Sequence, residues 1–218
     1  MRHTFICVMA IILGCATGLG EPGYAFGEQP VPPFDIDGRV SRFLTAERDA
    51  WADLNVPYED GQILFDLVLR GRFRNILEIG TSTGHSTIWL AWAAAKTGGM
   101  VTTIEIDRDR HEAALDNFRR AGVLRYIDAR LADAHELIPK LKGPFDFVFC
   151  DADKEWYLTY FLDLKSKMAA HGCYAAHNVL RHGGPEAAEF VRYVKRLPGF
   201  RTVIERGSGE GISVTCRE

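Results

Sequence analysis

The feature that most constrains the fold of this chain is a regular alternation of short apolar runs with longer helical stretches, which begins at residue 75. Such alternation is typical of βαβ units, in which helices cover both faces of a parallel sheet. The run at residues 145–150 is almost wholly apolar, as expected of a strand that is buried on both faces. We therefore predict an α/β fold with a doubly wound, mostly parallel, Rossmann-like sheet.

The predicted sheet has seven strands, five of which precede a closing antiparallel hairpin. The five strands are residues 75–80, 101–106, 126–130, 145–150 and 173–176. The hairpin pairs residues 200–205 with 211–216 across a glycine-rich turn. Helical spacing is found at residues 37–54, 59–69, 86–96, 108–121, 134–141, 155–169 and 185–197. A chain of 218 residues is long enough for one such domain, which we place at residues 37–218.

The composition is that of an ordinary globular protein, with 47% hydrophobic and 25% charged residues. The formal net charge is -3, and acidic and basic residues are interspersed along the chain. A protein whose main partner is a nucleic acid usually carries a basic face. The sequence therefore predicts no nucleic-acid partner.

The N-terminal part of the chain has the pattern of a signal peptide. Arg2 precedes an apolar run at residues 5–13, and residues 25–27 offer a small-x-small cleavage pattern. The apolar run is too short for a typical membrane span. We predict a signal peptide at residues 1–27 and a proline-rich linker at residues 28–36, with no membrane span in the mature domain. The protein would then be periplasmic or secreted; an uncleaved leader on a cytoplasmic protein is the alternative.

Cysteine usage bears on the same question. Cys7 and Cys15 lie in the leader, and the residues around Cys15 resemble the lipobox of bacterial lipoproteins, which would add a lipid anchor. Cys150, Cys173 and Cys216 remain in the domain, each within an apolar, strand-like run. An odd count of this kind argues against a disulfide framework. We therefore expect three buried free thiols, although an oxidising compartment favours disulfides.

The loop after the first predicted strand has the features of a ligand site. Gly80 and Gly84 are four residues apart, and Glu78 lies two residues before the first glycine. This spacing differs from the Gly-x-Gly-x-x-Gly pattern that seats a pyrophosphate on a helix N-terminus. It suits a ligand with an amino-acid end, whose ammonium Glu78 would attract directly or through water. An ordinary strand-to-helix turn is the alternative.

The ends of the next two predicted strands carry matching signals. Glu105 ends the second strand, where an acid can accept hydrogen bonds from both ribose hydroxyls. Asp133 and Ala134 follow the third strand, where they would border an adenine ring. Each residue alone could be a solvated strand end. Because Glu78, Glu105 and Asp133 lie at the ends of three successive strands, together they predict a nucleoside ligand that also has an amino-acid end.

Four segments resemble the catechol and caffeoyl-CoA O-methyltransferase family. They are residues 57–62, 76–87, 102–107 and 145–154. The resemblance runs from about residue 56 to the C-terminus. It implies a class I methyltransferase fold and an S-adenosylmethionine-dependent O-methyltransferase. The acceptor would be the hydroxyl of a catechol-like or other phenolic small molecule, and a homodimer is implied.

The resemblance also assigns residues to the cofactor. The predicted cofactor-binding residues are Glu78, Gly80, Thr81, Gly84, Ser86, Glu105, Asp133, Ala134 and Asp151. His85 lies in the same loop and could touch the ligand, whereas His135, His171 and His182 are interpreted as surface histidines. The alternative is a non-catalytic S-adenosylmethionine-binding or interaction module; a nicotinamide-dependent dehydrogenase is a more distant one.

Members of this family commonly hold a divalent metal with an Asp after the fourth strand and an Asp-Asn pair after the fifth. Asp151 and Asn178 match the first and last ligand, but His177 stands at the middle position. His177 is interpreted as a metal ligand that shifts preference toward Zn²⁺, Mn²⁺ or Fe²⁺, as a general base in place of the metal, or as a strand-end histidine without either role. Lys154 matches the catalytic lysine of the family and would act as a general base; a helix-start lysine is the alternative.

Overall fold

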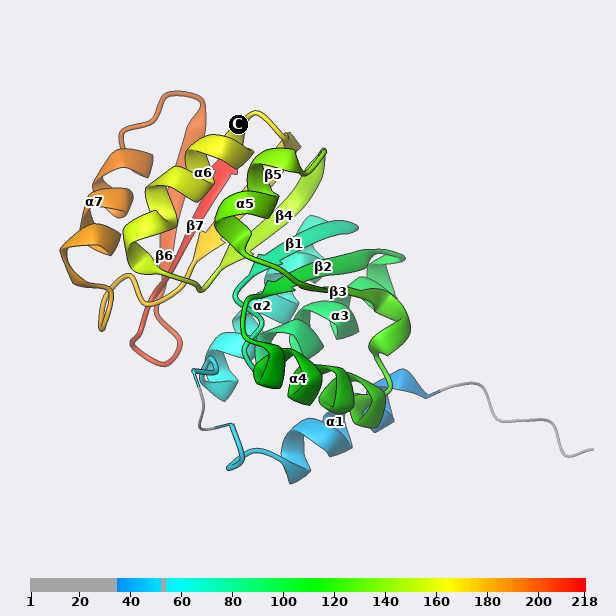
Figure 1. Cartoon of the computed structure of the whole chain (residues 1–218). Helices are drawn as coiled ribbons and strands as arrows, with labels where there is room; N and C mark the ends of the chain where they lie inside the picture. Colours follow the sequence, from blue (N-terminus) through cyan, green and yellow to red (C-terminus); the bar gives the residue numbers. More distant parts are fainter. Residues whose placement is uncertain (1–34, 52–53) are drawn as a thin grey trace, which may run out of the picture. The chain divides into compact units, whose positions relative to one another are not determined.

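The computed structural model describes residues 35–51 and 54–218. The predicted signal peptide and most of the predicted linker lie outside the described residues. A seven-stranded sheet forms the centre of the domain, in the order β3-β2-β1-β4-β5-β7-β6 (Figure 1). The strands are β1 (Asn75–Ile79), β2 (Met100–Glu105), β3 (Ile127–Leu131), β4 (Phe145–Cys150), β5 (Met168–Ala176), β6 (Phe200–Glu205) and β7 (Ile212–Arg217).

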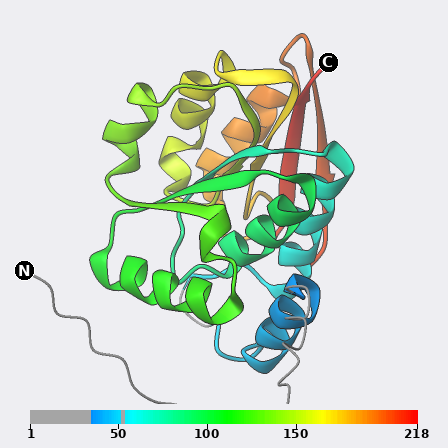
Figure 2. The same cartoon turned by 90° about the vertical axis from the view of Figure 1, so that its right-hand side faces the viewer.

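The first five strands pair in parallel, whereas β7 is antiparallel to both β5 and β6. Helices cover both faces: α1 to α4 lie on one side of the sheet and α5 to α7 on the other (Figures 1 and 2). They are α1 (Ile36–Ala46), α2 (Tyr58–Gly71), α3 (His85–Thr97), α4 (Arg108–Ala121), α5 (Ala134–Leu137), α6 (Tyr157–Lys165) and α7 (Gly184–Val194). The predicted doubly wound sheet with a C-terminal antiparallel hairpin is confirmed. None of the helices in the described ranges is long and apolar enough to cross a membrane.

The period-two geometry of a strand explains why the sheet has two cores. In β4, Phe147 and Phe149 face the core formed with α1 to α4, and Val148 and Cys150 face the core formed with α6 and α7. All four side chains have no solvent exposure. Both faces of the strand are therefore filled with apolar groups, as the uninterrupted apolar run predicts.

The direction of winding reverses beside β1, which lies between β2 and β4. Ligands of open α/β sheets bind at such a reversal, outside the carboxyl ends of the strands. Backbone hydrogen bonds hold these ends side by side. The donor-to-acceptor pairs are Gly80 N to Ile104 O (3.1 Å), Asp151 N to Ile79 O (2.9 Å) and His177 N to Cys150 O (3.0 Å). The loops after β1, β4 and β5 are thereby brought together.

Three predicted helices end at least four residues earlier in the structure than expected. The predicted helix at residues 37–54 ends at Ala46, and the ring of Trp51 instead stacks on His85, with 4.6 Å between the ring centroids. The helix predicted at 134–141 stops at Leu137 and continues as a 3₁₀ turn that contains Pro139, which has no N–H for an α-helical hydrogen bond. The helix predicted at 155–169 ends at Lys165, because β5 already begins at Met168.

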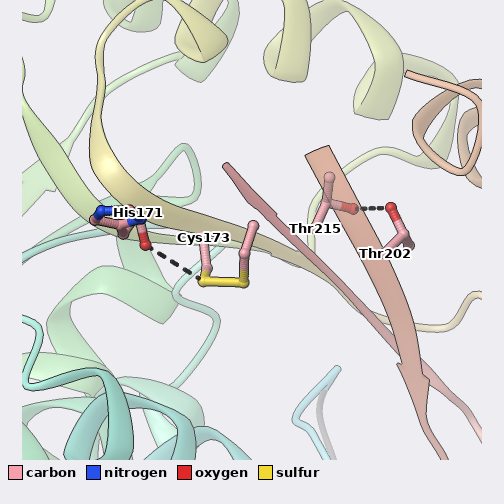
Figure 3. The surroundings of a disulfide bond; sticks show 5 residues. His171, Cys173, Thr202 and Thr215 are labelled. Atoms are coloured by element: carbon pink, nitrogen blue, oxygen red, sulfur yellow. Dashed lines mark hydrogen bonds between the residues drawn. A yellow bond between two sulfur atoms is a disulfide. The ribbon is translucent and has the colours of Figure 1, made fainter. Parts of the chain in front are cut away.

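The prediction of three free thiols is wrong. Cys173 of β5 and Cys216 of β7 form a disulfide, and Cys150 is the free, buried cysteine of the described ranges (Figure 3). The two antiparallel strands place Cys173 directly opposite Cys216 in register. Directly opposite residues of an antiparallel pair are close enough for a disulfide. The sequence could not reveal this, because it does not show that β7, rather than β6, lies next to β5.

Candidate functional site

A cavity of about 580 Å³ opens at the carboxyl ends of the parallel strands, within the size range of small-molecule sites. Five of the predicted cofactor-binding residues line it: Gly80, Glu105, Asp133, Ala134 and Asp151. The predicted catalytic and metal residues line the same cavity: Asp151, Lys154, His177 and Asn178. The topology therefore brings side chains from five separate loops to one site.

Four other predicted cofactor-binding residues do not line this cavity: Glu78, Thr81, Gly84 and Ser86. All four of these residues are buried. Gly84 has φ +97° and begins α3, and a Cβ at this position would lie 2.4 Å from the ring of Phe118 on α4. In this structure Gly84 thus serves the packing of α3 on α4.

Gly80 has a direct role in the shape of the site. Its φ of +92° lies in the left-handed region, and a Cβ would come within 2.5 Å of the carbonyl oxygen of Asp151. The loops after β1 and β4 can approach this closely only because residue 80 has no side chain. A glycine is therefore required where the two halves of the site meet.

Glu78 is fully buried, and burial raises the pKa of its carboxyl to about 7 despite the nearby hydroxyls of Ser86, Thr103 and Thr87. Oε2 accepts hydrogen bonds from Thr103 Oγ1, at 2.6 Å, and from Thr87 Oγ1. Within the described part of the chain, Oε1 has no hydrogen bond of good geometry. A buried acceptor with unused capacity is costly, and this one fits an ammonium group bound above it, directly or through water.

Glu105 is held at the edge of the cavity by backbone donors. Its Oε2 accepts from Ser82 N at 2.7 Å, and its Oε1 accepts from Ile106 N at 3.1 Å and from Asp107 N at 2.9 Å. A carboxylate has about four lone-pair sites, and three of them are used, so Oε2 can still accept one hydroxyl hydrogen. The geometry fits a ribose hydroxyl at Oε2.

The wall beyond Glu105 contains residues that the sequence interpretation missed. His135 lines the cavity rather than the open surface, and its ring lies 3.9 Å from that of Trp156, centroid to centroid. Tyr160 also lines the cavity, and its ring is stacked against His135. Asp133 accepts from the backbone N–H of His135 at 2.8 Å and so begins α5. These planar groups suit a flat heterocycle, but no sequence signal distinguishes them from core aromatics.

At the other end of the cavity, charged side chains form a connected chain. Lys154 Nζ lies 2.8 Å from Asp151 Oδ1. Nδ1 of His177 lies 3.2 Å from Asp151 Oδ2, an ion-pair contact without the alignment of a good hydrogen bond. Nε2 of His177 lies 2.8 Å from Oδ2 of Asp60. His177 is therefore placed between two carboxylates.

Asp60 comes from α2 and is 117 residues before His177 in the chain. Its side chain has no solvent exposure. It also accepts from Ser208, at 3.0 Å from the backbone N–H and 2.6 Å from Oγ. Asp60 lies within the family-like segment at residues 57–62, but that resemblance gave it no role.

Electrostatic interactions among His177, Asp60 and Asp151 determine which of these side chains are charged. Burial alone would lower the pKa of His177, but the carboxylates of Asp151 and Asp60 outweigh it and raise the pKa to about 9. Burial likewise favours the neutral acids, yet contact with His177 holds the pKa of both Asp60 and Asp151 below the usual range. At neutral pH an imidazolium thus lies between two carboxylates.

The predicted metal-ligand residues do not fit a metal ion. Both oxygens of Asp151 face cations, and both ring nitrogens of His177 face carboxylates. Asn178 donates through Nδ2 to Glu210 at 3.2 Å and would offer a metal its amide oxygen alone. Across residues 35–51 and 54–218, no three His, Cys, Asp or Glu side chains are arranged to hold a metal ion together.

His85 belongs to the helix-packing layer rather than to the cavity. Burial lowers its pKa to about 4, so the ring is neutral. Nδ1 lies 2.8 Å from the carbonyl oxygen of Val56, and Nε2 accepts from Trp89 Nε1 at 3.1 Å. With both nitrogens used and no position in the cavity lining, the expectation that His85 touches the ligand is not supported.

Comparison with known proteins identifies the family of this chain. A family model described as O-methyltransferase matches residues 40–210. A catechol O-methyltransferase of Niastella koreensis is 36% identical over 158 residues, which cover 68% of this chain and 71% of the relative. A caffeoyl-CoA O-methyltransferase of Eucalyptus globulus is 32% identical over 167 residues, covering 73% of this chain and 67% of the relative.

A solved O-methyltransferase structure has the same fold as this chain. The O-methyltransferase of Bacillus cereus in complex with SAH superimposes with a TM-score of 0.72 at 26% identity, covering 87% of this chain and 93% of that chain. SAH, S-adenosylhomocysteine, is what S-adenosylmethionine becomes when its methyl group leaves. The resemblance to catechol and caffeoyl-CoA O-methyltransferases is confirmed. The chain belongs to the O-methyltransferase family, with S-adenosylmethionine as its cofactor.

Proposed function

We propose that this protein transfers a methyl group from S-adenosylmethionine to the hydroxyl of a small phenolic acceptor of the catechol type. The observation that carries the proposal is that Glu105 and the Asp151–Lys154–His177 cluster line the same cavity. The cavity thus has one end suited to the nucleoside of the cofactor and a charged end suited to the acceptor hydroxyl, so that cofactor and acceptor could bind at the same time. The names of the matched relatives, a catechol and a caffeoyl-CoA O-methyltransferase, support a phenolic acceptor.

The proposed division of roles follows the position of each residue. S-adenosylmethionine supplies an electrophilic methyl group on a positively charged sulfur. Glu105 would hold a ribose hydroxyl through Oε2, and Gly80 leaves room for the methionine end, whose ammonium Glu78 attracts from below. Ala134 and the ring of His135 would border the base. These contacts orient the reacting atoms, which can supply much of the rate acceleration of a displacement.

Side chains at the acceptor end of the cavity would remove the proton of the acceptor hydroxyl. Lys154 would first lose a proton to water and would then, as the free amine, take the proton of the acceptor hydroxyl and become an ammonium again. Its Nζ has two acceptors in place, Asp151 Oδ1 at 2.8 Å and the carbonyl oxygen of Ala152 at 3.2 Å. Both would stabilise the ammonium until the proton passes to water. His177 has a carboxylate on each nitrogen and therefore no free lone pair, so we assign it a positioning and electrostatic role instead of a proton-accepting one.

A direct assay tests this function. The full chain is incubated with S-adenosylmethionine carrying a labelled methyl group and with catechol, a monohydroxy phenol or an aliphatic alcohol. Transfer of label to a phenolic oxygen, with little transfer to the alcohol, is the expected result. Calorimetry in parallel measures cofactor binding. Tight cofactor binding without transfer to any acceptor would favour a non-catalytic binding module.

We also propose that the domain works in an oxidising compartment. The disulfide between Cys173 and Cys216 supports this, because disulfides persist in oxidising environments and are rare in cytosolic proteins. The signal-peptide pattern of residues 1–27 points the same way. Cell fractionation with N-terminal sequencing tests the proposal. An intact Met1 on a cytoplasmic, fully reduced protein would contradict it. The homodimer stays a prediction, which light scattering can test.

A further inference from the structure

We propose that His177, held between Asp60 and Asp151, supplies the positive charge that a divalent cation would otherwise supply at the acceptor end of the site, so that methyl transfer proceeds without a metal. The inference rests on the proposed methyl transfer for its catalytic meaning, but the charge and the metal binding can be measured separately. Asp60 and Ser208 are assigned as positioning residues for His177.

The first step of the argument concerns the donor set. Hard divalent cations take six or more oxygen ligands, and softer ones need free imidazole nitrogens or thiolates. Asp151 already binds Lys154 through one oxygen and contacts His177 through the other. Both ring nitrogens of His177 face carboxylates, and Asn178, whose Nδ2 donates to Glu210, would offer a cation its amide oxygen alone. A cation could bind here only after these contacts were broken.

The second step concerns the protonation state, which the contacts define. Asp60 accepts hydrogen bonds from Ser208 N and Ser208 Oγ, and donors of this kind favour the ionised carboxylate. Asp151 faces the ammonium of Lys154 and is ionised for the same reason. A neutral imidazole has one N–H and would turn a lone pair toward one of the two carboxylates. The placement of each ring nitrogen beside a carboxylate therefore favours the imidazolium, with hydrogen on both nitrogens.

The third step is the charge balance. Asp60 and Asp151 contribute two negative charges, and His177 and Lys154 contribute two positive charges. The cluster is neutral as it stands, so an additional divalent cation would leave two uncompensated positive charges unless His177 and Lys154 released their protons. The same imidazolium lines the cavity, where it would favour the ionised form of an acceptor hydroxyl, which is the form that attacks the methyl carbon.

Chelation provides the first test. The full chain is stripped with a strong chelator, its metal content is checked by mass spectrometry, and the methyl-transfer rate is compared with and without added Mg²⁺ or Mn²⁺. Rates within twofold of each other, and no saturable site in calorimetric titrations with either metal, are expected. A tenfold or larger loss that metal restores, or stoichiometric metal binding, would overturn the inference.

Nitrogen NMR of histidine-labelled protein provides a test that needs no activity. Both ring nitrogens of His177, assigned through His177→Asn, should show the shifts of an imidazolium at pH 7. One protonated and one bare nitrogen would overturn the inference. Asp60→Asn should move these signals and lower the rate, and Ser208→Ala should move them less. If no phenol is methylated with or without metal, the proposed function fails, whereas the NMR and metal titrations still decide this inference.

An exchange of the histidine completes the test. His177→Asp would place a third carboxylate beside Asp60 and Asp151, which creates a cluster of hard oxygen donors in place of the imidazolium. The variant should bind Mn²⁺ at least tenfold more tightly than the wild type. His171→Asp, the same exchange at an exposed position of β5, serves as the control and should bind no better than wild type. Equal Mn²⁺ affinity for all three proteins would contradict the claim that His177 is what excludes the metal.

Discussion

The disulfide between β5 and β7 allows a stability prediction with a worked magnitude. Cys216→Ser removes the cross-link between residues separated by 43 positions. In the chain-entropy account, closing a loop of this length lowers the entropy of the unfolded chain by roughly 13 cal/mol/K, which is about 4 kcal/mol at 25 °C. This is a large part of the roughly 5–15 kcal/mol by which a domain is usually stable. We expect the free energy of unfolding to fall by about that amount.

Urea unfolding, followed by circular dichroism with and without reductant, measures the effect. The wild type should lose about 4 kcal/mol when reductant is added, and Cys216→Ser should lose nothing further. The variant thus controls for effects of the reductant itself. Thiol titration of the denatured wild type should find two additional thiols after reduction. A wild type whose stability and thiol count do not respond to reductant would refute the reasoning.

Three further predictions concern the site. Lys154→Met should lower kcat roughly 100- to 10,000-fold, which is the usual contribution of a general base, while calorimetry should find cofactor affinity unchanged. Glu155→Gln, at an exposed neighbouring position, serves as the control. An unaltered kcat in Lys154→Met would show that Lys154 is not the base. Gly80→Ala should weaken cofactor binding at least tenfold, because its Cβ would lie 2.5 Å from a carbonyl oxygen at a φ of +92°; wild-type affinity would contradict this. The pKa of His177, raised to about 9 by its two carboxylates, adds stability that is fully present below about pH 6.5 and is lost as the pH rises through 9. Urea unfolding from pH 7 to 10 should therefore show a loss on the order of 3 kcal/mol, which His177→Gln should abolish; an equal loss in the variant would assign it elsewhere.

Local sequence patterns predicted correctly those elements and residues whose position depends on a single continuous segment of the chain. The α4 bounds agree with the prediction, since Asp107 caps its first turn and Gly122 ends it in the left-handed region. The β4 bounds agree as well, because an apolar run buried on both faces admits little else. The Gly80 position was recognisable for a similar reason: a glycine directly after a strand and close to an acid marks a tight turn over a ligand. Glu105 was found because it ends its strand.

Other features depend on which segments become neighbours, and no local pattern contains that information. Asp60 joins His177 from 117 residues away, so the family motif that contains Asp60 says nothing of its partner. His177 remained open to three interpretations until both of its nitrogens were seen to face carboxylates. The disulfide depends on the insertion of β7 between β5 and β6, and His135 enters the cavity wall only through the packing of α5 and α6.

By itself, the amino-acid sequence determined the fold class and the position of a loop for a nucleoside ligand with an amino-acid end, because hydrophobic periodicity and strand-end residues act over short distances along the chain. The resemblance to a known family supplied the identity of the cofactor. The tertiary structure alone decided the charge of His177, the partner of each cysteine and the poor fit to a metal ion. Those properties arise from contacts between distant segments in a buried site, where electrostatic interactions are strong and each carboxylate changes the protonation of its neighbour.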